Sequence, residues 1–444
     1  MQLPVQLLDS LRNVPGFDKE AFEKVHVAAE EITSVRINPA KRSKISNVQS
    51  QIPWTEFGYY LQERPSFTFD PLFHAGCYYV QEASSMFLEQ AFKQLIDLSQ
   101  PLKVLDLSAA PGGKSTHIQS LISPDSLLVS NDVIRSRASI LKDNIIKWGC
   151  ENVMVTNNDP KDFEALKDYF DIIVVDAPCS GSGLFRREPD AIEEWSLNHV
   201  QLCSQRQQRI VADVWKALKK DGLLIYSTCS YSTEEDEGIV EWMLKHLPAV
   251  YCPLSIDSIW GLTETSNGYR FWPHNLKGEG FFLSCLMKSG HGNPSSIKPH
   301  KEPAFASKTE MNIIGNWAVT EGRKLVKSKE RVYAWPQHLS KDFNFLLNHL
   351  RIAYSGTILG AILREKFVPD HALAMSSIKS ASINRIALTY EQAIAYLKRR
   401  DLSIENVQKG WQLVTFENHT LGWINALSNR INNYYPKELR ILKD

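Results

Sequence analysis

The chain has 444 residues, too many for one compact core, so we expect two or three domains. Its 43% hydrophobic and 23% charged residues are ordinary for a globular protein and exclude a disordered, collagen-like or coiled-coil chain. Fifty Lys and Arg balance fifty Asp and Glu, so the overall charge identifies no polyanionic partner.

The apolar runs and the cysteines indicate whether the chain is expected to cross a membrane, to be secreted or to bind a metal. No apolar run approaches the roughly 18 residues of a membrane-spanning helix, and the N-terminus lacks a basic segment before an apolar one. The seven cysteines are odd in number and never spaced as Cys-x-x-Cys, which argues against a disulfide framework and a zinc site. We expect a cytoplasmic monomer with no membrane partner and no metal.

The charge is unevenly distributed along the chain. Residues 290–444 carry 22 Lys and Arg against 13 Asp and Glu, whereas the rest of the chain carries 28 against 37. A basic third joined to an acidic two-thirds favours one module that holds a polyanion. A solvated, lysine-rich surface is the alternative that charge alone leaves open.

In chain order, residues 1–98 mix short amphipathic helices with extended segments, which predicts an N-terminal α/β region. Over residues 99–289, short runs of Val, Ile and Leu alternate with helical patterns. Such runs suit strands buried on both faces, with the helices as crossovers, so we predict a Rossmann-like, doubly wound α/β sheet. Two later runs, GYRFWP and GFFLSCLM, have no long helix between them and would close the sheet as an antiparallel pair, giving seven strands.

The last third of the chain begins after a change in composition. The segment from Ser289 to Lys308 is rich in Gly, Pro, Ser and Lys, and we predict a linker over residues 290–310. Residues 311–444 regain apolar periodicity, which indicates a small mixed α/β or β-rich domain.

A glycine-rich loop, DLSAAPGGKS (residues 106–115), follows the first predicted strand and opens a helix. Gly112 and Gly113 permit a close approach of the backbone, and the first helical turn offers free N–H groups. A P-loop would need glycine at the position of Ser108, and Pro111 lacks an N–H, so a nucleotide hydrolase is a distant alternative. The loop favours a nucleoside-type cofactor.

Three acids end successive predicted strands: Asp132, Asp159 and Asp176. Asp132 stands 20 residues after Gly112, where an acid would bind ribose hydroxyls, and Asp159 would reach an adenine. Each acid alone would more often be a helix cap or a surface residue, but together they favour the cofactor. Because the Gly-x-Gly-x-x-Gly pattern is absent, NAD is disfavoured.

Two cysteines follow the next strand ends, Cys179 in DAPCSGSG and Cys229 in YSTCSYS. A lone cysteine in an apolar strand is most often inert packing. Adjacent parallel strands, however, would bring both thiols to the cofactor edge of the sheet, where a thiolate can act as a nucleophile.

This combination suits methylation of a pyrimidine at carbon 5. A cysteine that adds to carbon 6 makes carbon 5 reactive enough to take the methyl group of S-adenosylmethionine, after which a base removes the carbon 5 proton. Asp176 would bond the ring nitrogen or amino group and stabilise the developing charge. An exocyclic-amine methyltransferase would show Asn/Asp-Pro-Pro-aromatic at the fourth strand, which Asp-Ala-Pro-Cys does not match.

In order and spacing, the motifs DLSAAPGGKS, FDIIVVDAPCSGSG and YSTCSYSTEEDE resemble those of the Sun-type RNA cytosine-C5 methyltransferases. The C-terminal segment GWQLVTFENHTLGWINALSNRINNYYPKELRI resembles the PUA-like tail of the bacterial ribosomal RNA members of RsmF type. The resemblance implies a seven-stranded methyltransferase sheet over 99–289, an N-terminal RNA-binding region over 1–98 and a PUA-like RNA-binding domain over 311–444.

The resemblance also implies roles for individual residues. Cys229 would be the nucleophile, and Cys179 would help to release the product. Contacts to S-adenosyl-L-methionine would come from Ser108, Ala109, Ala110, Pro111, Gly112, Gly113, Lys114, Asp132, Asp159 and Asp176. One departure is Ser108, where cysteine is common in the family.

The sequence therefore predicts transfer of a methyl group to carbon 5 of a cytosine in RNA through a covalent cysteine–cytosine adduct. We favour 16S rRNA or the small ribosomal subunit as the partner, with tRNA as the alternative substrate. A non-catalytic RNA-binding ribosome assembly factor is the alternative from another class. The basic run Lys398-Arg399-Arg400 and the pair Arg186-Arg187 are predicted to contact RNA phosphates.

Overall fold

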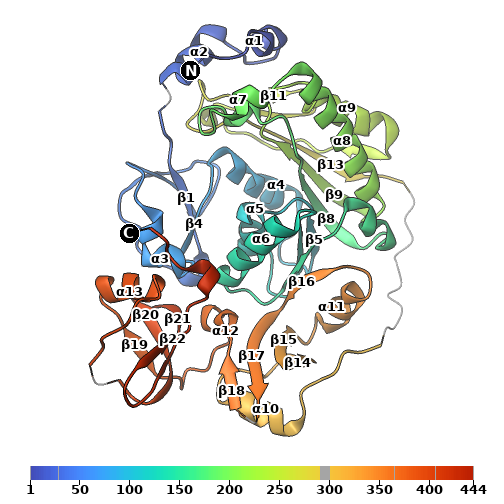
Figure 1. Ribbon diagram of the computed structural model, residues 1–444. Coiled ribbons are helices and arrows are strands. Elements are labelled where there is room, and N and C mark those ends of the chain that lie inside the picture. Colours follow the sequence, from blue (N-terminus) through green and yellow to red (C-terminus); the bar gives the residue numbers. More distant parts are fainter. Residues whose placement is uncertain (1, 29, 291–300, 365, 406, 444) are drawn as a thin grey trace.

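The structure, a computed structural model, describes residues 2–28, 30–290, 301–364, 366–405 and 407–443. Within these ranges the chain forms four β-sheets (Figure 1). The largest lies in the middle of the molecule, and the three smaller sheets have four strands each. None of the described helices combines the length and the apolar character needed to cross a bilayer.

The N-terminal region consists of two leading helices, one short later helix and an antiparallel sheet. Its elements are α1 (Val5–Leu11), α2 (Lys19–Ala28), β1 (Ser34–Ile37), β2 (Val48–Gln51), β3 (Gly58–Leu61), α3 (Pro71–His74) and β4 (Tyr78–Val80). The strand order is β2-β3-β1-β4. The two helices pack away from this sheet, where Leu7, Leu11 and Phe22 share a core with Tyr231 and Trp272 of the central region.

The central sheet has the order β11-β12-β13-β9-β8-β5-β6-β7-β16, and β10 also pairs with β13. Its strands are β5 (Lys103–Asp106), β6 (Leu127–Asn131), β7 (Val153–Thr156), β8 (Phe170–Asp176), β9 (Leu218–Thr228), β10 (Ala249–Tyr251), β11 (Thr263–Thr265), β12 (Gly268–Phe271), β13 (Phe281–Lys288) and β16 (Ile352–Ser355). Strands β7, β6, β5, β8 and β9 are parallel, and β13 and β12 are antiparallel. The predicted doubly wound α/β fold is thus confirmed, and three further strands extend it beyond the predicted seven.

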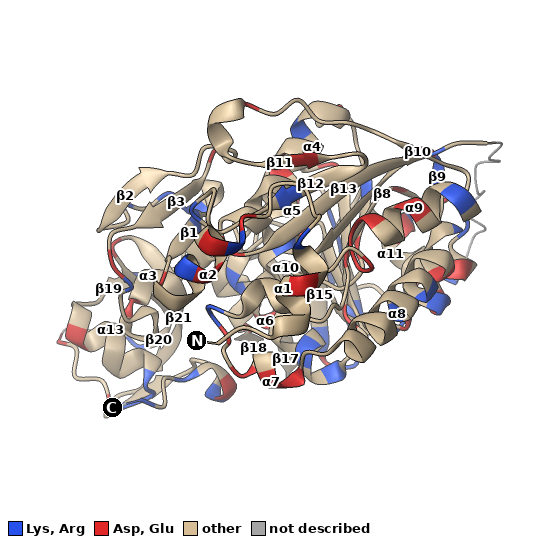
Figure 2. Cartoon of the chain, turned by 90° about the horizontal axis from the view of Figure 1, so that it is seen from above, with Lys and Arg blue, Asp and Glu red and all other residues tan. Residues whose placement is uncertain are grey.

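Helices cover both faces of the parallel strands. The covering helices are α4 (Leu88–Leu95), α5 (Gly113–Leu121), α6 (Arg135–Trp148), α8 (Leu197–Trp215) and α9 (Glu237–His246). Alternate residues of one strand enter different cores: Val104 packs with Ile118 of α5, whereas Leu105 packs with Val214 of α8. Burial on both faces explains why these strands are continuously apolar. Acidic and basic residues lie on the outer helices α8 and α9 (Figure 2).

The C-terminal third contains two small sheets where the sequence predicts one domain over 311–444. The first comprises β14 (Arg323–Ser328), β15 (Arg331–Pro336), β17 (Thr357–Leu363) and β18 (Lys366–Pro369), with α10 (Lys308–Gly315), α11 (Ser340–Leu347) and α12 (His371–Met375). The second comprises β19 (Arg385–Ala387), β20 (Gly410–Phe416), β21 (His419–Ala426) and β22 (Ile431–Asn433), with α13 (Tyr390–Leu397). The domain boundaries stay a prediction; of the predicted linker, residues 291–300 lie outside the described residues.

Two contacts distant in sequence attach the C-terminal third to the rest of the molecule. Strand β16 pairs with β7 and so covers an edge that would otherwise expose unpaired backbone groups. The tail sheet β19-β20-β21-β22 packs on the N-terminal sheet, because Val35 and Leu61 share a core with Val414 and Leu421. Figure 1 shows α13 and β21 beside α3.

Candidate active site

The glycine-rich loop joins the carboxyl end of β5 to α5. Gly112 has a φ of 116°, in the left-handed region that favours glycine, and it caps α5. Ala109 N–H donates to Asn131 O of β6 at 2.7 Å, and Arg137 donates to Ala110 O at 2.9 Å. The predicted loop residues 108–114 therefore sit at the strand ends, as the motif requires.

Two of the predicted acids are engaged with nearby groups. Asp132 is buried, and its carboxylate accepts from Ile134 N at 2.9 Å and lies 3.5 Å from Arg137 Nε. Asp159 accepts from Lys161 N at 3.1 Å as a helix cap, and its Oδ2 lies 3.7 Å from Arg209 of α8. Capping is the ordinary alternative for such an acid, and contact of Asp159 with an adenine stays a prediction.

Asp176 ends β8 and is held from two sides. Lys114 Nζ lies 2.8 Å from Asp176 Oδ2, and Ser227 Oγ donates to Oδ1 at 2.8 Å. Burial alone would lower the pKa of Lys114, but Asp176 and Asp106 outweigh it and raise that pKa. Lys114 is thus a cation beside Asp176, and 36% of the Asp176 side chain remains accessible.

The two predicted thiols meet at the ends of neighbouring strands. Strands β8 and β9 pair in parallel with Asp176 opposite Ser227, so the loops that follow run side by side. Cys179 Sγ lies 3.0 Å from Cys229 Sγ. The hydrogen bond with Cys229, followed by burial, raises the pKa of Cys179 well above its usual value, so Cys179 keeps its proton at neutral pH.

Glycine permits this close approach. Gly183 N–H donates to Cys229 O at 2.9 Å, and a Cβ at Gly183 would lie 2.7 Å from that oxygen and 2.6 Å from Gly280 O. Real Cβ atoms do not approach backbone oxygens so closely. Gly183, the last residue of the PCSGSG sequence, is thus needed to bring the two cysteine loops together.

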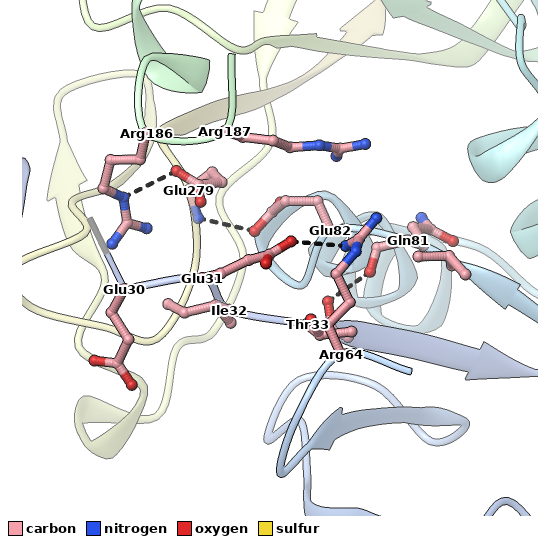
Figure 3. A pocket seen from close by; sticks show the side chains of 12 residues that line it. Glu30, Glu31, Ile32, Thr33, Arg64, Gln81, Glu82, Arg186, Arg187 and Glu279 are labelled. Atoms are coloured by element: carbon pink, nitrogen blue, oxygen red, sulfur yellow. Dashed lines mark hydrogen bonds and ion pairs between the residues drawn. The ribbon is translucent and has the colours of Figure 1, made fainter. Parts of the chain in front are cut away.

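The pair Arg186-Arg187 divides between two roles. Arg186 Nε lies 3.0 Å from Glu279 Oε2, and only 4% of its side chain is exposed. The prediction of a phosphate contact is therefore wrong for Arg186, whose charge is paired inside the protein. Arg187 is exposed and points away from this pair along a polar pocket of about 260 Å³ (Figure 3).

Sequence reasoning missed two carboxylates close to the predicted residues. Asp106, the last residue of β5, is fully buried and accepts from Ser115 Oγ at 2.6 Å. Glu235 is fully buried behind the two cysteines. Both belong to motifs quoted above, but Glu235 is one of four consecutive acids, residues 234–237, and the local sequence does not mark which of them are buried. Among the described residues, no group of three or more His, Cys, Asp or Glu is arranged to hold a metal ion.

A parallel sheet closed by an antiparallel hairpin, with a glycine-rich loop after its first strand and an acid after its second, defines a Rossmann-like methyltransferase. Four family models match the chain: the N-terminal domain of 16S rRNA methyltransferase RsmF (residues 3–83), 16S rRNA methyltransferase RsmB/F (93–287), the RsmF rRNA methyltransferase first C-terminal domain (304–376) and the methyltransferase RsmF PUA domain (383–441). The chain belongs to the RsmB/F family, with the N- and C-terminal domains of RsmF. The predicted family resemblance and PUA-like domain are thus confirmed.

Named relatives agree over nearly the whole chain. Ribosomal RNA small subunit methyltransferase F of Aeromonas salmonicida is 30% identical over 91% of this chain and 90% of its own. The protein of the same name from Pectobacterium atrosepticum is 27% identical over 98% and 96%.

Two solved structures share the fold. A methyltransferase homologue from Pyrococcus horikoshii has a TM-score of 0.52 and 26% identity, covering 64% of this chain and all of that one. NSun6 from the same organism, solved with SFG, has a TM-score of 0.54 and 21% identity, covering 65% and 99%.

Proposed function

We propose that this enzyme transfers a methyl group from S-adenosyl-L-methionine to carbon 5 of a cytosine in 16S rRNA. The family assignment supports the reaction class and the RNA substrate. The observation that carries the chemistry is the pair of sulfur atoms 3.0 Å apart at the ends of β8 and β9. Two thiols that close can act on the same face of one pyrimidine ring.

Cys229 is the proposed nucleophile. Its thiolate adds to carbon 6 of the ring, which makes carbon 5 electron-rich. Cys179 keeps its proton because its pKa is raised, and its S–H can donate to the Cys229 sulfur. After methylation, Cys179 gives its proton to the departing Cys229 sulfur, and the Cys179 thiolate so formed accepts the proton from carbon 5, which restores the double bond of the ring.

Asp176 and Lys114 are proposed to hold the base. The accessible carboxylate of Asp176 accepts a hydrogen bond from the ring amino group, and Lys114 fixes that carboxylate from 2.8 Å. A cation so close to the site also stabilises the negative charge that develops on the ring during attack.

The residues around the loop fit S-adenosyl-L-methionine. Asp106 Oδ1 is buried with no hydrogen-bond partner among the described residues, and burial raises the Asp106 pKa to about 7. A buried acceptor without a donor is costly, and an ammonium group such as that of the methionine moiety would satisfy it. When bound, the sulfonium supplies the electrophilic methyl group.

We assign the predicted loop and acids to this cofactor. The loop backbone approaches it closely, and Asp132 binds the ribose. The proposed contacts are Ser108, Ala109, Ala110, Pro111, Gly112, Gly113, Lys114, Asp132, Asp159 and Asp176.

RNA is proposed to lie across the thiol edge and the basic tail. Arg187 and Gln81 both line the pocket of Figure 3. Gln81 also lies next to the glycine-rich loop, because a Cβ built on Gly113 would be 3.7 Å from Gln81 Cδ. The pocket thus borders both the glycine loop and the loop after Cys179. The target base leaves its stack to reach the thiols, at a cost of about a few kcal/mol. Because the substrate is ribosomal RNA, we place the enzyme in the cytoplasm.

Methyl transfer from labelled S-adenosyl-L-methionine tests the proposal. We expect incorporation into 16S rRNA or small subunits from cells that lack the protein, and bisulfite sequencing should locate one 5-methylcytosine. Incorporation into tRNA alone would select the alternative substrate. Binding of rRNA without any methylation would instead support an assembly factor.

A further inference from the structure

Glu235 lies in the loop after β9 and forms hydrogen bonds with both cysteine loops. The side chain is fully buried. Its Oε1 accepts from Ser180 N at 2.7 Å, and its Oε2 accepts from Ser180 Oγ at 2.5 Å and from Ser230 Oγ at 2.6 Å. Ser180 directly follows Cys179, and Ser230 directly follows Cys229. One carboxylate therefore bonds to the neighbour of each thiol.

Further hydrogen bonds, to the side chain and to the backbone carbonyl of Glu235, connect this residue to the surrounding elements. Gln207 of α8 lies 3.5 Å from Glu235 Oε1 and donates to Pro178 O at 3.0 Å. Tyr226 of β9 donates its hydroxyl to Glu235 O at 2.6 Å. The network thus connects α8 and β9 with the loop that carries Cys179.

The burial of this acid is costly and calls for an explanation. Burial raises the pKa of Glu235, while the hydrogen bonds from Ser180 and Ser230 oppose that shift. Its hydrogen-bond partners are hydroxyl and amide groups, which carry no positive charge to offset the negative charge of the buried carboxylate. The fold could fill this space with a neutral side chain, but a neutral amide has only one acceptor oxygen and cannot accept three bonds in this geometry.

We propose that Glu235 is a positioning residue that holds Cys179 and Cys229 at reacting distance by bonding to Ser180 and Ser230. It acts through the two loops and does not contact the base. The inference rests on the proposed roles of the two thiols, but the geometry it describes can be measured without RNA.

Oxidation of the thiol pair by diamide measures the geometry directly. The two thiols lose two protons and two electrons to the N=N bond of diamide, which leaves a Cys179–Cys229 disulfide and a hydrazine. Peptide mapping by mass spectrometry separates this bond from those of the other five cysteines. In Glu235→Gln we expect disulfide formation several-fold slower than in the wild type, because the loops separate.

The direction of this change distinguishes position from charge. Loss of a nearby negative charge favours thiolates, so a purely electrostatic role for Glu235 predicts faster oxidation in Glu235→Gln. An unchanged or faster rate would overturn the proposal. Glu241→Gln, an exposed acid on α9, is the matched control and should oxidise like the wild type.

A second variant keeps the test valid if Glu235→Gln does not fold. Ser180→Ala with Ser230→Ala retains the carboxylate but removes its two hydroxyl donors, and it should also oxidise several-fold more slowly. Disulfide formation at the wild-type rate in either variant would contradict the proposal.

Turnover provides the functional measurement. We expect kcat on rRNA to fall by about 10- to 100-fold in Glu235→Gln with KM unchanged, because misplaced groups slow the chemistry and leave RNA binding intact. Glu235→Asp, which restores the charge, should recover part of kcat. If the wild type methylates no RNA, the proposed function fails while the oxidation result still decides the role of Glu235.

Discussion

In the central sheet, the parallel strands are covered by helices from the same continuous segment of the chain, whereas the N-terminal and tail sheets cover each other from opposite ends of the chain. In Figure 1 the tail elements α13 and β21 lie against α3. The proposed chemistry thus belongs to one continuous segment, and part of the proposed RNA-binding surface is assembled from two distant ones. Changes in the first should affect turnover, and changes in the second should affect stability across both ends of the chain.

The largest expected effect tests whether chemistry is confined to the central sheet. Cys229→Ala removes the proposed nucleophile and should lower methyl transfer to rRNA by about 10⁴-fold or more. Cys179→Ser should instead accumulate a protein–RNA adduct that survives denaturing gel electrophoresis. Cys252→Ser, at the edge of β13 that faces away from β9, is the control. An adduct in Cys229→Ala would reverse the two roles.

The next effect concerns the cation and acid that border the thiols. Asp176→Asn weakens the bond to Lys114 and removes the charge that faces the base, so we expect kcat to fall by about 10²- to 10³-fold. Steady-state kinetics at saturating rRNA would measure it. A kcat within threefold of the wild type (about 0.6 kcal/mol) would remove Asp176 from the reaction.

The shared core predicts a stability effect that reaches both ends of the chain. Leu421→Ala in β21 should cost about 2–5 kcal/mol in free energy of unfolding and speed hydrogen exchange in β1 and β3, because that core includes Val35 and Leu61. Leu127→Ala in β6 is the matched control, with a similar cost but unchanged exchange in β1 and β3, because Leu127 packs in a different core. Equal exchange in the two variants would show that the sheets are independent.

The smallest expected effect is on pH dependence at the same junction. His74 lies 3.3 Å from Tyr435 of the tail, and burial lowers the His74 pKa to about 4. The unfolded chain binds the proton near pH 6.5 and the folded chain does not, so stability present above that pH is lost as pH falls toward 4. From pH 7 to pH 5 we expect His74 to contribute a loss of about 2 kcal/mol in the free energy of unfolding. Urea unfolding at the two pH values should show a smaller loss of stability in His74→Gln than in the wild type. An equal loss would assign the pH dependence to other groups.

Much of the central region was predictable because its determinants are local. Continuous apolar runs revealed strands buried on both faces, and the acids and cysteines at their ends marked one edge of the sheet. Asp159 shows the limit of this reasoning, since an acid after a strand serves equally as a helix cap. Arg186 shows another, because its partner Glu279 lies 93 residues away and nothing in the local sequence announces the pair.

The sequence by itself determined the order of the motifs that follow the strands and the positions of the glycines that let the loops approach. It also determined which carboxylates, thiols and amines are available for the reaction. Only the tertiary structure decided that Glu235 bonds behind both thiols, that β16 completes the edge beside β7, and that the first and last sheets share a core. Periodicity and spacing report which face of an element is buried. The partner that buries it depends on contacts between segments hundreds of residues apart, which local patterns do not encode.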